Sequence, residues 1–300
     1  MASALTYLDV LYQGTSQSIA CGVLETSAGL LLVDPGPTVS MKTLVAGLQA
    51  HGVALQDVHA LLLTHIHLDH AGATGSLVQA HPDLQVYVHE RGAPHLINPA
   101  RLLDSARRIY GDAMDTLWGD FLAVPAANVH VLKGGEAPVF GGRRLQVAYT
   151  PGHAVHHVSY LDEQTGTAFV GDVAGMCLTG LDYVLPVTPP PDVDLEAWHE
   201  SLALVRSWAP EQLFLTHFGP ATDPDRHLDD MGRALDLWSE RVRISLEDDA
   251  DDATRAARFH EAALADLKGQ VPPAAEAVYV NFGHPMGGWY GLARYWRKRG

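Results

Sequence analysis

The sequence predicts an α/β protein in which two β-sheets pack against each other, with helices on the outside and a helical region at the C-terminal end. Three observations lead to this prediction. Short apolar runs with the character of strands fill much of the first 90 residues and return after residue 124. Residues 92–124 have apolar side chains at helical spacing, and the pattern from Asp223 onward is almost wholly helical. The chain is therefore divided into residues 1–222, with a helical insertion at about 92–124, and residues 223–300.

The first third of the chain is predicted to form a hairpin followed by β–α units. The runs "SIACGVLET" and "GLLLVDPG" are separated by "SAG", which is typical of a β-hairpin. "TVSMKTLVAGLQAHG" has helical spacing, with Thr and Ser near its start and Gly after its end. "VHALLLTH" is a short continuous apolar run, which indicates a strand buried on both faces. A helix in "AGATGSLVQAH" and a strand in "LQVYVHE" follow it.

After the helical insertion the pattern returns to strands. Four strands are predicted in "ANVHVLKGG", "RRLQVAYT", "HHVSYLDE" and "GTAFVGD". "DLEAWHESLALVRSW" predicts a helix, and "EQLFLTH" is expected to be the last strand. Helices then account for the rest of the chain, interrupted at "LEDDADDATR" and "GQVPPAAE".

Composition and charge limit the classes of function. The formal net charge is −15, which argues against nucleic acid as a partner, because binding phosphates requires a basic surface. No apolar stretch approaches the roughly 20 residues that span a bilayer, and the first residues lack the pattern of a signal peptide. Cys21 and Cys177 lie in apolar surroundings and are expected to be buried free thiols. We therefore expect a cytoplasmic protein that acts on a small molecule and binds neither nucleic acid nor membrane, with a homodimer left open.

The heptapeptide "THIHLDH" at residues 64–70 is the most informative stretch of the sequence. It places His65, His67, Asp69 and His70 directly after the predicted buried strand "VHALLL". Imidazole nitrogens and carboxylate oxygens are ligands for zinc, manganese or iron, and the stretch lacks the thiolates of a structural zinc site. The heptapeptide therefore predicts half of a metal site, whose other ligands must come from elsewhere in the chain.

Three more candidate ligands lie where other predicted strands end. His153 follows a strand in "VAYTPGH", Asp172 follows one in "TAFVGD", and His217 follows one in "LFLTH". Any one of these histidines means little in a chain with 17 histidines, and an isolated one is more simply a packed core residue. The four segments together are unlikely to arise by chance, because strand ends fix the backbone from which loops direct side chains to a shared site.

The order T-H-x-H-x-D-H, T-P-G-H, G-D and T-H resembles the pattern of the metallo-β-lactamase-fold hydrolases, over about residues 5–220. The resemblance implies an αββα sandwich with the site at one edge of its two sheets. It also implies that Asp34, in "LLLVDPG", supports the metal loop without binding metal. The implied ligands are His65, His67 and His153 for one ion, Asp69, His70 and His217 for the other, and Asp172 as the bridge between them.

The branch that this resemblance favours contains the glyoxalase II-like hydrolases and the acyl-homoserine lactonases, which use the same seven ligands. It implies a hydrolase with two divalent ions, zinc expected and manganese or iron as alternatives, that cleaves an ester, thioester or lactone. A hydroxide bridging the ions would attack the carbonyl, with Asp69 and Asp172 orienting it. The alternative is an oxidoreductase similar to the persulfide dioxygenases, which use one iron. A non-enzymatic binding protein is disfavoured by the complete ligand set.

Several aromatic and histidine residues have open roles at this stage. Tyr183, in "GLDYVLP", follows the bridging Asp at a place where related lactonases often put an aromatic residue near the substrate, so it is a candidate oxyanion donor or else a packed loop residue. His156 and His157 are close enough in sequence to His153 to support the ligands or to be simple strand residues. Tyr110, Met114, Trp118 and Phe121 are expected to be either core or a cover of the cleft, and Trp289, Leu292 and Trp296 to form a face that docks on the main domain. No role is expected for four histidines at helix ends or surface-like positions: His51, His81, His130 and His227.

Overall fold

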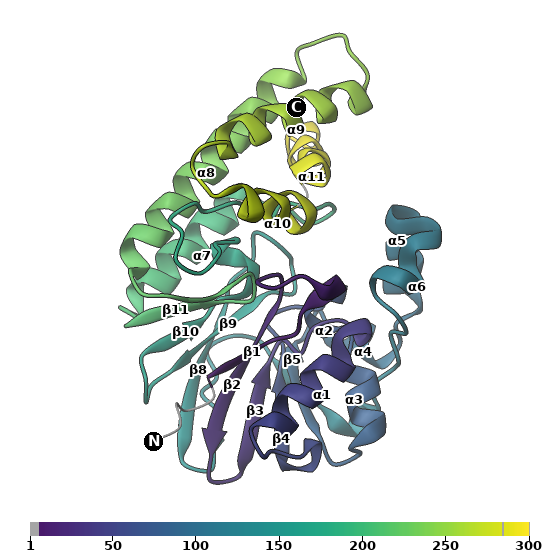
Figure 1. Cartoon of the computed structure of the whole chain (residues 1–300), viewed down its shortest axis with the longest axis vertical. Coiled ribbons are helices and arrows are strands. Elements are labelled where there is room, and N and C mark those ends of the chain that lie inside the picture. Colours follow the sequence, from purple (N-terminus) through teal and green to yellow (C-terminus); the bar gives the residue numbers. More distant parts are fainter. Residues whose placement is uncertain (1–5, 284, 300) are drawn as a thin grey trace.

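Two six-stranded sheets stack face to face at the centre of the protein (Figure 1). The computed structural model describes residues 6–283 and 285–299. The first sheet contains, in spatial order, β1 (Tyr7–Asp9), β2 (Ala20–Thr26), β3 (Gly29–Val33), β4 (Val58–Leu62), β5 (Gln85–His89) and β6 (Val129–Leu132). The second contains β12 (Gly219–Ala221), β11 (Gln212–Leu215), β10 (Thr167–Phe169), β9 (Val158–Asp162), β8 (Arg143–Tyr149) and β7 (Val139–Phe140).

The strand order explains why several loops meet at one edge of the sandwich. In the first sheet β2 and β3 form an antiparallel hairpin, and β3, β4, β5 and β6 run parallel. In the second sheet β10 and β11 are parallel, while the other pairs are antiparallel. The carboxyl ends of parallel neighbours lie at the same sheet edge, so the loops that follow β3 and β4, and those that follow β10 and β11, emerge together.

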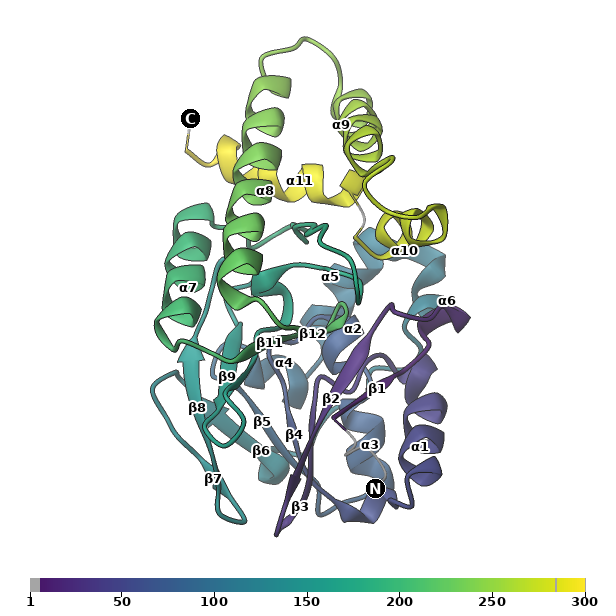
Figure 2. The same ribbon diagram turned by 60° about the vertical axis from the view of Figure 1, so that its left-hand side comes forward.

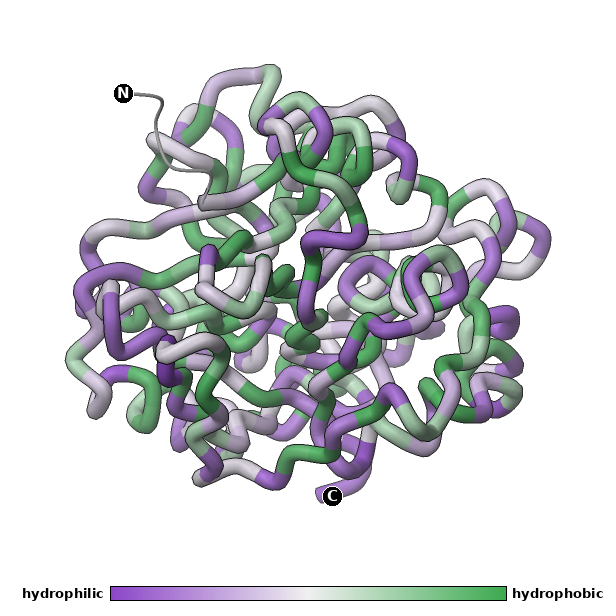
Figure 3. The backbone as a smooth tube through the Cα atoms, turned by 90° about the horizontal axis from the view of Figure 1, so that it is seen from below, coloured by the Kyte–Doolittle hydropathy of each residue, from purple (hydrophilic) through white to green (hydrophobic). Residues whose placement is uncertain are grey.

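Alternation along the strands produces two apolar cores. On β3, Leu31 and Val33 belong to the core that includes the space between the sheets, while Leu30 and Leu32 face the core beneath the outer helices. Successive side chains of a strand point to opposite faces, so a strand covered on both sides needs an unbroken apolar run such as "GLLLV". Figure 3 shows green apolar stretches alternating with purple polar ones along the backbone, as expected of elements with one buried face.

Helices cover both outer faces of the sandwich. The helices are α1 (Met41–Ala50), α2 (Leu68–Ala71), α3 (Thr74–Ala80), α4 (Ala93–Ile97), α5 (Ala100–Tyr110), α6 (Met114–Leu117), α7 (Leu195–Ser207), α8 (Pro224–Ser245), α9 (Asp252–Leu267), α10 (Pro273–Gly283) and α11 (Pro285–Arg297). Leucines of α1, α3 and α4 pack in the core outside the first sheet, and Trp198, Leu202 and Val205 of α7 pack against the second. The family's αββα sandwich, predicted from the resemblance, is confirmed.

The insertion contains the short helices α4, α5 and α6, in agreement with the helical spacing predicted for residues 92–124. Met114, Trp118 and Phe121 are buried, while Tyr110 is half-buried and packs edge-on against Trp118 with ring centroids 5.2 Å apart. The stripe is therefore mainly core, which was one of its two predicted roles. Tyr110 and Trp118 also line a cleft described below.

The C-terminal helices rise above one end of the sandwich (Figures 1 and 2). Trp289 and Leu292 of α11 are fully buried, but the prediction that this face docks on the main domain is only partly right. The Trp289 indole nitrogen donates to Ser245 Oγ at 2.9 Å, and Trp296 donates to Ser239, so both tryptophans pack against α8. The other end of α8 makes the contact with the sandwich, through apolar side chains of the same core.

Two further predictions need correction. "EQLFLTH" is not the last strand, because β12 (Gly219–Ala221) turns back and pairs with β11. Its three residues, Gly-Pro-Ala, carry none of the alternation by which strands are recognised. His227 lies near the start of α8, which agrees with a position at a helix end, but it is not at the surface: it is 6% exposed, and its ring bonds to the carbonyl oxygen of Ala174 at 2.8 Å. Among the described residues, no helix is both long and apolar enough to cross a membrane.

Candidate metal centre

The loop after β4 is held by one buried carboxylate. Asp34, directly after β3, accepts hydrogen bonds from the Thr64 amide (2.8 Å) and hydroxyl (2.6 Å), from His70 Nδ1 (2.8 Å) and from the Thr216 hydroxyl (2.8 Å). These donors belong to two different segments of the predicted site, residues 64–70 and the end of β11 before His217. Asp34 is fully buried and adopts a left-handed backbone conformation (φ 52°), which aspartate tolerates better than most residues. Its position agrees with the predicted supporting role.

The structure brings all seven predicted ligands together. Their ligand atoms form two groups, within each of which all atoms lie within 4.8 Å of one another: His65, His67, His153 and Asp172 in one, and Asp69, His70 and His217 in the other. His65 and His70 are fully buried, whereas the Asp69 side chain is 24% exposed. The segments come from the ends of β4, β8, β10 and β11, so residues up to 152 positions apart in sequence share one sheet edge.

Asp172 lies between the two groups. Its Oδ2 is 3.4 Å from His153 Nε2 and 4.0 Å from His65 Nε2. Its Oδ1 is 3.2 Å from His70 Nε2 and 3.6 Å from His217 Nε2. Tetrahedral ligands about 2.0–2.1 Å from an ion are roughly 3.3 Å apart, so these separations suit two ions that share one carboxylate.

In three of the histidines, a hydrogen bond made by Nδ1 orients the ring so that Nε2 faces the centre. His153 Nδ1 donates to the carbonyl oxygen of Val187 at 2.8 Å, and His217 Nδ1 donates to that of Ser18 at 2.7 Å. His70 Nδ1 donates to Asp34. A neutral imidazole carries one N–H, so each inner Nε2 presents a lone pair. His65 Nε2 and His153 Nε2 both lie 2.9 Å from His67 Nδ1, which places three imidazole nitrogens around one point.

The electrostatics of the centre call for cations. Burial lowers the pKa of His153 to about 4, and it also lowers the pKa of His65 well below its ordinary value, so both stay neutral near pH 7. Burial opposes the charged form of His70, but the carboxylates around it, with Asp172 first, raise its pKa well above the usual range. In the part of the chain that the structure describes, no lysine or arginine forms an ion pair with Asp34, Asp69 or Asp172.

Two buried polar atoms at the centre have no hydrogen-bond partner. These atoms are His70 Nε2 and Asp172 Oδ1, which face each other across the gap between the two groups. Buried polar groups are normally satisfied, and an unpartnered pair beside other ligand atoms fits a site built for a metal ion. The donor set of five imidazoles and two carboxylates suits zinc, manganese or iron.

Helix α7 positions two of the ligand loops, a role that the sequence did not suggest. The Trp198 indole nitrogen donates to the carbonyl oxygen of Val173 at 2.7 Å, next to Asp172, and its ring packs edge-on against His153 at 5.7 Å. Gly152, just before His153, has φ +130°, and a Cβ there would lie 2.4 Å from the Cα of Trp198. The only signal in the sequence is a tryptophan one turn into a predicted helix, which packing alone would explain.

The centre opens into a cleft of about 510 Å³. His67, Asp69, Asp172 and His217 contribute to its floor. Its walls come from the N-terminal segment, the insertion, the segment before α7, the end of α10 and the first turn of α11. The wall residues used below are Tyr12, Tyr110, Trp118, Phe282, Arg91, His95, Arg101 and Asp192. A cleft of this size suits a small molecule.

Tyr183 is not among the residues that line this cleft. Its ring packs edge-on against Tyr279 at 5.4 Å, and the Tyr279 hydroxyl donates to the Tyr183 carbonyl oxygen at 2.6 Å. Burial raises the pKa of Tyr183 to about 12, and the charged groups that also act on it are Asp266 and Arg241 of the C-terminal helices. Its position therefore gives no support to a role as oxyanion donor, because α10 covers the loop that carries it.

His156 and His157 lie behind the ligands. His156 is 8% exposed, stacks parallel to His65 and also lines the cleft. His157 is fully buried and shares a hydrogen bond of 2.9 Å with the Thr150 hydroxyl. Of the histidines predicted to have no role, His81 bonds to the Val58 carbonyl oxygen and His130 to Gln85, away from the centre.

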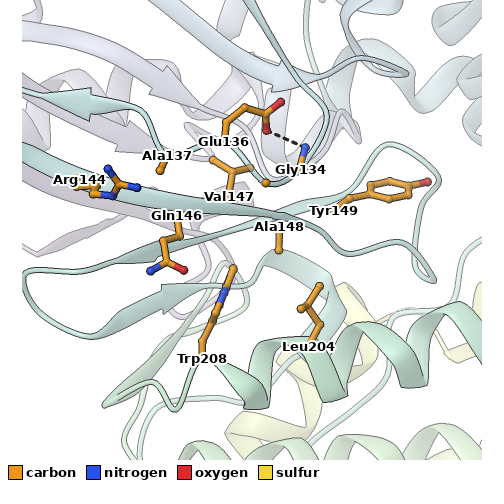
Figure 4. Close-up of a pocket in the computed structure, with 11 residues that line it drawn as sticks. Gly134, Glu136, Ala137, Arg144, Gln146, Val147, Ala148, Tyr149, Leu204 and Trp208 are labelled. Atoms are coloured by element: carbon orange, nitrogen blue, oxygen red, sulfur yellow. Dashed lines mark hydrogen bonds between the residues drawn. The ribbon is translucent and has the colours of Figure 1, made fainter.

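A second hollow lies between β8 and α7 (Figure 4). It is more open to solvent than the cleft and is lined by residues such as Glu136, Gln146, Leu204 and Trp208. The Glu136 carboxylate is occupied, because it accepts hydrogen bonds from the amides of Lys133 and Gly134. None of its lining residues belongs to the metal centre, so we place function in the cleft.

Comparison with known proteins agrees with this site. The model of the metallo-beta-lactamase superfamily matches residues 15–217, a span that begins before β2 and ends on the predicted ligand His217. The chain belongs to the metallo-beta-lactamase superfamily. Members of the superfamily are similar to it at modest identity, and the match leaves out the C-terminal helices α8 to α11.

Three proteins illustrate how similar the chain is to its relatives in sequence and in fold. The metallo-beta-lactamase fold-containing protein ST1585 of Sulfurisphaera tokodaii is 30% identical over 198 residues, which cover 64% of this chain and 72% of that protein. In the crystal structure of ST1585 the fold matches with a TM-score of 0.66 at 22% identity, over 92% of this chain and 93% of that one. The hydroxyacylglutathione hydrolase of Legionella pneumophila strain Corby is 26% identical over 61% of this chain, and the match spans about half of its length (55%). TTHA1623, solved in a di-iron-bound form, has a TM-score of 0.54 and 30% identity, over 72% of this chain and 93% of that one.

Proposed function

We propose that the protein is a dinuclear metal-dependent hydrolase that cleaves a carboxylic ester, a thioester or a lactone. The observation that carries this proposal is the position of Asp172, whose two oxygens face two separate groups of ligand atoms at the floor of the cleft. The similarity to hydroxyacylglutathione hydrolases, which by name cleave thioesters, supports hydrolysis of an acyl compound.

The residues of the chain divide the work between holding the ions and positioning the reactants. When bound, two divalent cations supply Lewis acidity and a water that loses its proton near neutral pH. Asp69 lies at the cleft floor and is partly exposed, so its carboxylate can accept a hydrogen bond from the attacking water and orient it. Asp172 is almost fully buried, so its charge acts on the ions and does not depend on solvent.

The identity of the ions is part of the proposal. Nitrogen and oxygen ligands without a thiolate are consistent with zinc, which we propose, and also with manganese or iron. TTHA1623 binds two irons, which keeps iron as the alternative. The cytoplasmic location and a homodimer remain predictions.

The experiment is a substrate panel with metal analysis. Protein loaded with zinc, manganese or iron is assayed on thioesters, lactones, aryl esters and phosphodiesters, and its metal content is measured. We expect about two ions per chain and turnover of at least one carboxylic ester, thioester or lactone. Asp172→Asn should lower both metal content and turnover, by about 10³-fold for turnover, whereas Asp182→Asn, which removes an exposed carboxylate, should change neither.

Two outcomes would overturn the proposal. One iron per chain with oxygen consumption on a persulfide would instead support the dioxygenase-like alternative. Full turnover by protein that contains no metal would remove the basis for any role of the seven ligands.

A further inference from the structure

We propose that the substrate combines a flat apolar group, which packs against an aromatic wall of the cleft, with an anionic group that binds Arg91 and Arg101 at the cleft's edge. This inference rests on the proposed hydrolase function and names the chemical class of its substrate. It selects aromatic acyl compounds that carry a carboxylate or a phosphate.

The aromatic wall comes from three segments far apart in the sequence. Tyr12 and Trp118 stack nearly parallel, with ring centroids 5.5 Å apart and planes 9° apart. Phe282 meets Tyr12 edge-on at 5.5 Å, and Tyr110 meets Trp118 edge-on at 5.2 Å. All four rings line the cleft. Aromatic side chains arranged in this way offer ring faces and edges on which a flat apolar group can pack.

The wall lies close to the metal centre. Tyr12 and Tyr110 line the same cleft as Asp69. A substrate whose carbonyl reaches Asp69 can therefore place an adjoining ring on this wall. The side chains of Tyr12 and Trp118 are buried (4% and 8% exposed), so the surface they present is fixed by packing.

The charged side chains that the insertion contributes beside the aromatic wall are mainly positive, whereas the protein as a whole is negative. Residues 91–110 contain four arginines and one aspartate, in a chain whose net charge is −15. On α5, the residues that line the cleft are Arg101, Leu102, Ser105, Ala106, Ile109 and Tyr110. These positions form one face of the helix, and Arg107, paired with Asp104 at 3.7 Å, lies on the other.

Arg91 and Arg101 are available for a ligand. Neither guanidinium forms an ion pair with an acidic side chain in residues 6–283 and 285–299, and Arg91 lies 5.8 Å from the ring centre of Tyr149. Away from the metal centre, the acidic side chain that lines the cleft is Asp192, so two arginines and His95 outweigh it. The planar guanidinium binds carboxylate and phosphate with paired hydrogen bonds, which identifies the anionic group by its chemistry.

The test uses thioesters of one neutral thiol that share a naphthoyl group and differ in a second substituent: carboxylate, phosphonate or neutral carboxamide. We expect kcat/KM for an anionic thioester to exceed that for the carboxamide by about 10-fold, and to fall as salt is added. The two anionic arms distinguish a carboxylate from a phosphate as the natural group. The acetyl thioester of the same neutral thiol, which lacks a ring, should be poorer by a similar factor.

Variants test each half of the site. In the double variant Arg91→Gln/Arg101→Gln, the ratio of anionic to neutral kcat/KM should fall to below about 2. Arg107→Gln, which removes the same charge from the opposite face of α5, should keep the ratio. Tyr110→Ser should reduce the preference for naphthoyl over acetyl thioesters, and Tyr290→Ser, a tyrosine outside the cleft, should not.

A binding measurement separates failure of this inference from failure of the proposed function. Calorimetry on the metal-loaded protein compares a non-hydrolysable naphthyl ether that bears a carboxylate or a phosphonate with its carboxamide analogue. Tighter binding of the anionic ethers, lost in the double arginine variant, supports the inference even if no thioester is cleaved. Equal binding of charged and neutral ethers, or an unchanged ratio in the double arginine variant, would overturn it.

Discussion

At the scale of single residues, Asp34 joins two segments of the candidate metal centre. It accepts four hydrogen bonds, from Thr64, His70 and Thr216, and so joins the loop after β4 to the end of β11. The bond to His70 Nδ1 also leaves His70 Nε2 free to face Asp172. The two threonines each precede a ligand histidine, which is the sequence signal by which they can be recognised.

Replacing Asp34 with Asn should therefore weaken both the fold and the metal site. The amide keeps the shape but brings N–H groups toward donors, so we expect a loss of about 3 kcal/mol in the free energy of unfolding. Metal affinity should fall about 10- to 100-fold, because His70 loses its orienting partner. Chemical denaturation and a competitive metal titration measure the two effects. A stable variant with native metal affinity would contradict this role for Asp34.

At the scale of elements, the turn between β8 and β9 is pressed against α7. Gly152 approaches the backbone of Trp198 more closely than any side chain would permit, and it has a backbone angle that L-residues rarely adopt. The contact sets the place of His153 relative to Asp172, because Trp198 also bonds to Val173.

Gly152→Ala should cost about 2–4 kcal/mol of stability and lower the affinity of the metal centre, because either α7 or the His153 turn must shift. Gly135→Ala is the matched control, since Gly135 also has a positive φ (+95°) but no heavy atom within 4 Å of the added Cβ. The control should lose stability through backbone strain alone and keep native metal affinity. Equal metal affinities for the two variants, measured by titration, would argue against the contact as the positioning device.

The hairpin of β8 and β9 carries a buried ion pair that makes stability depend on pH. Burial by itself would raise the pKa of Asp162, but hydrogen bonds from Arg143 (2.6 and 3.0 Å) and Thr165 lower it overall. A lowered folded-state pKa means that the pair stabilises the protein above the unfolded pKa of about 3.9. The stabilisation is lost as the pH falls through the folded-state pKa.

Accordingly, the free energy of unfolding should fall as the pH drops below about 4, and Asp162→Asn should flatten that dependence. The variant should also be destabilised by about 3 kcal/mol at pH 7, because Arg143 is left with a neutral partner at a nearly buried position. Glu163→Gln, which removes the exposed partner of Arg144 in the same hairpin, should change little. Urea unfolding at pH 3 to 7 makes the comparison, and parallel pH profiles for Asp162→Asn and the unaltered protein would refute the assignment.

At the scale of the whole molecule, the metal centre lies where the two sheets and the C-terminal helices meet. Its ligands come from the first sheet at β4 and from the second at β8, β10 and β11. The hydrogen bond from the Val158 amide to the Thr64 carbonyl oxygen (2.7 Å) joins the sheets beside it. Metal binding is thus coupled to the packing of the entire sandwich.

Removing metal should lower the stability of the whole protein. An ion that binds only the folded state contributes about 2.7 kcal/mol when free metal is 100 times its Kd. A strong chelator should therefore lower Tm by about 5–10 °C, and added metal should restore it. Asp172→Asn, whose sites are already impaired, should show a smaller shift. Calorimetric scans that are identical with and without chelator would show that the ions are not bound at this junction.

The sequence by itself determined the fold class and the seven residues that the structure brings together. It did so because apolar runs of strand length end at histidines and aspartates followed by turns, and parallel strands present such ends at one edge. The short strands β1, β7 and β12 were missed, because two or three residues are too few to carry a periodic signal.

Only the tertiary structure decided which groups surround those seven residues. Tyr12, Tyr110 and Phe282 form one wall although they come from the N-terminal segment, the insertion and the C-terminal helices, whereas Tyr183 packs under α10 away from the cleft. Local periodicity shows which face of an element is buried but not which distant element covers it. That choice depends on how three segments distant in sequence fit together, and it determines the shape and charge of the cleft.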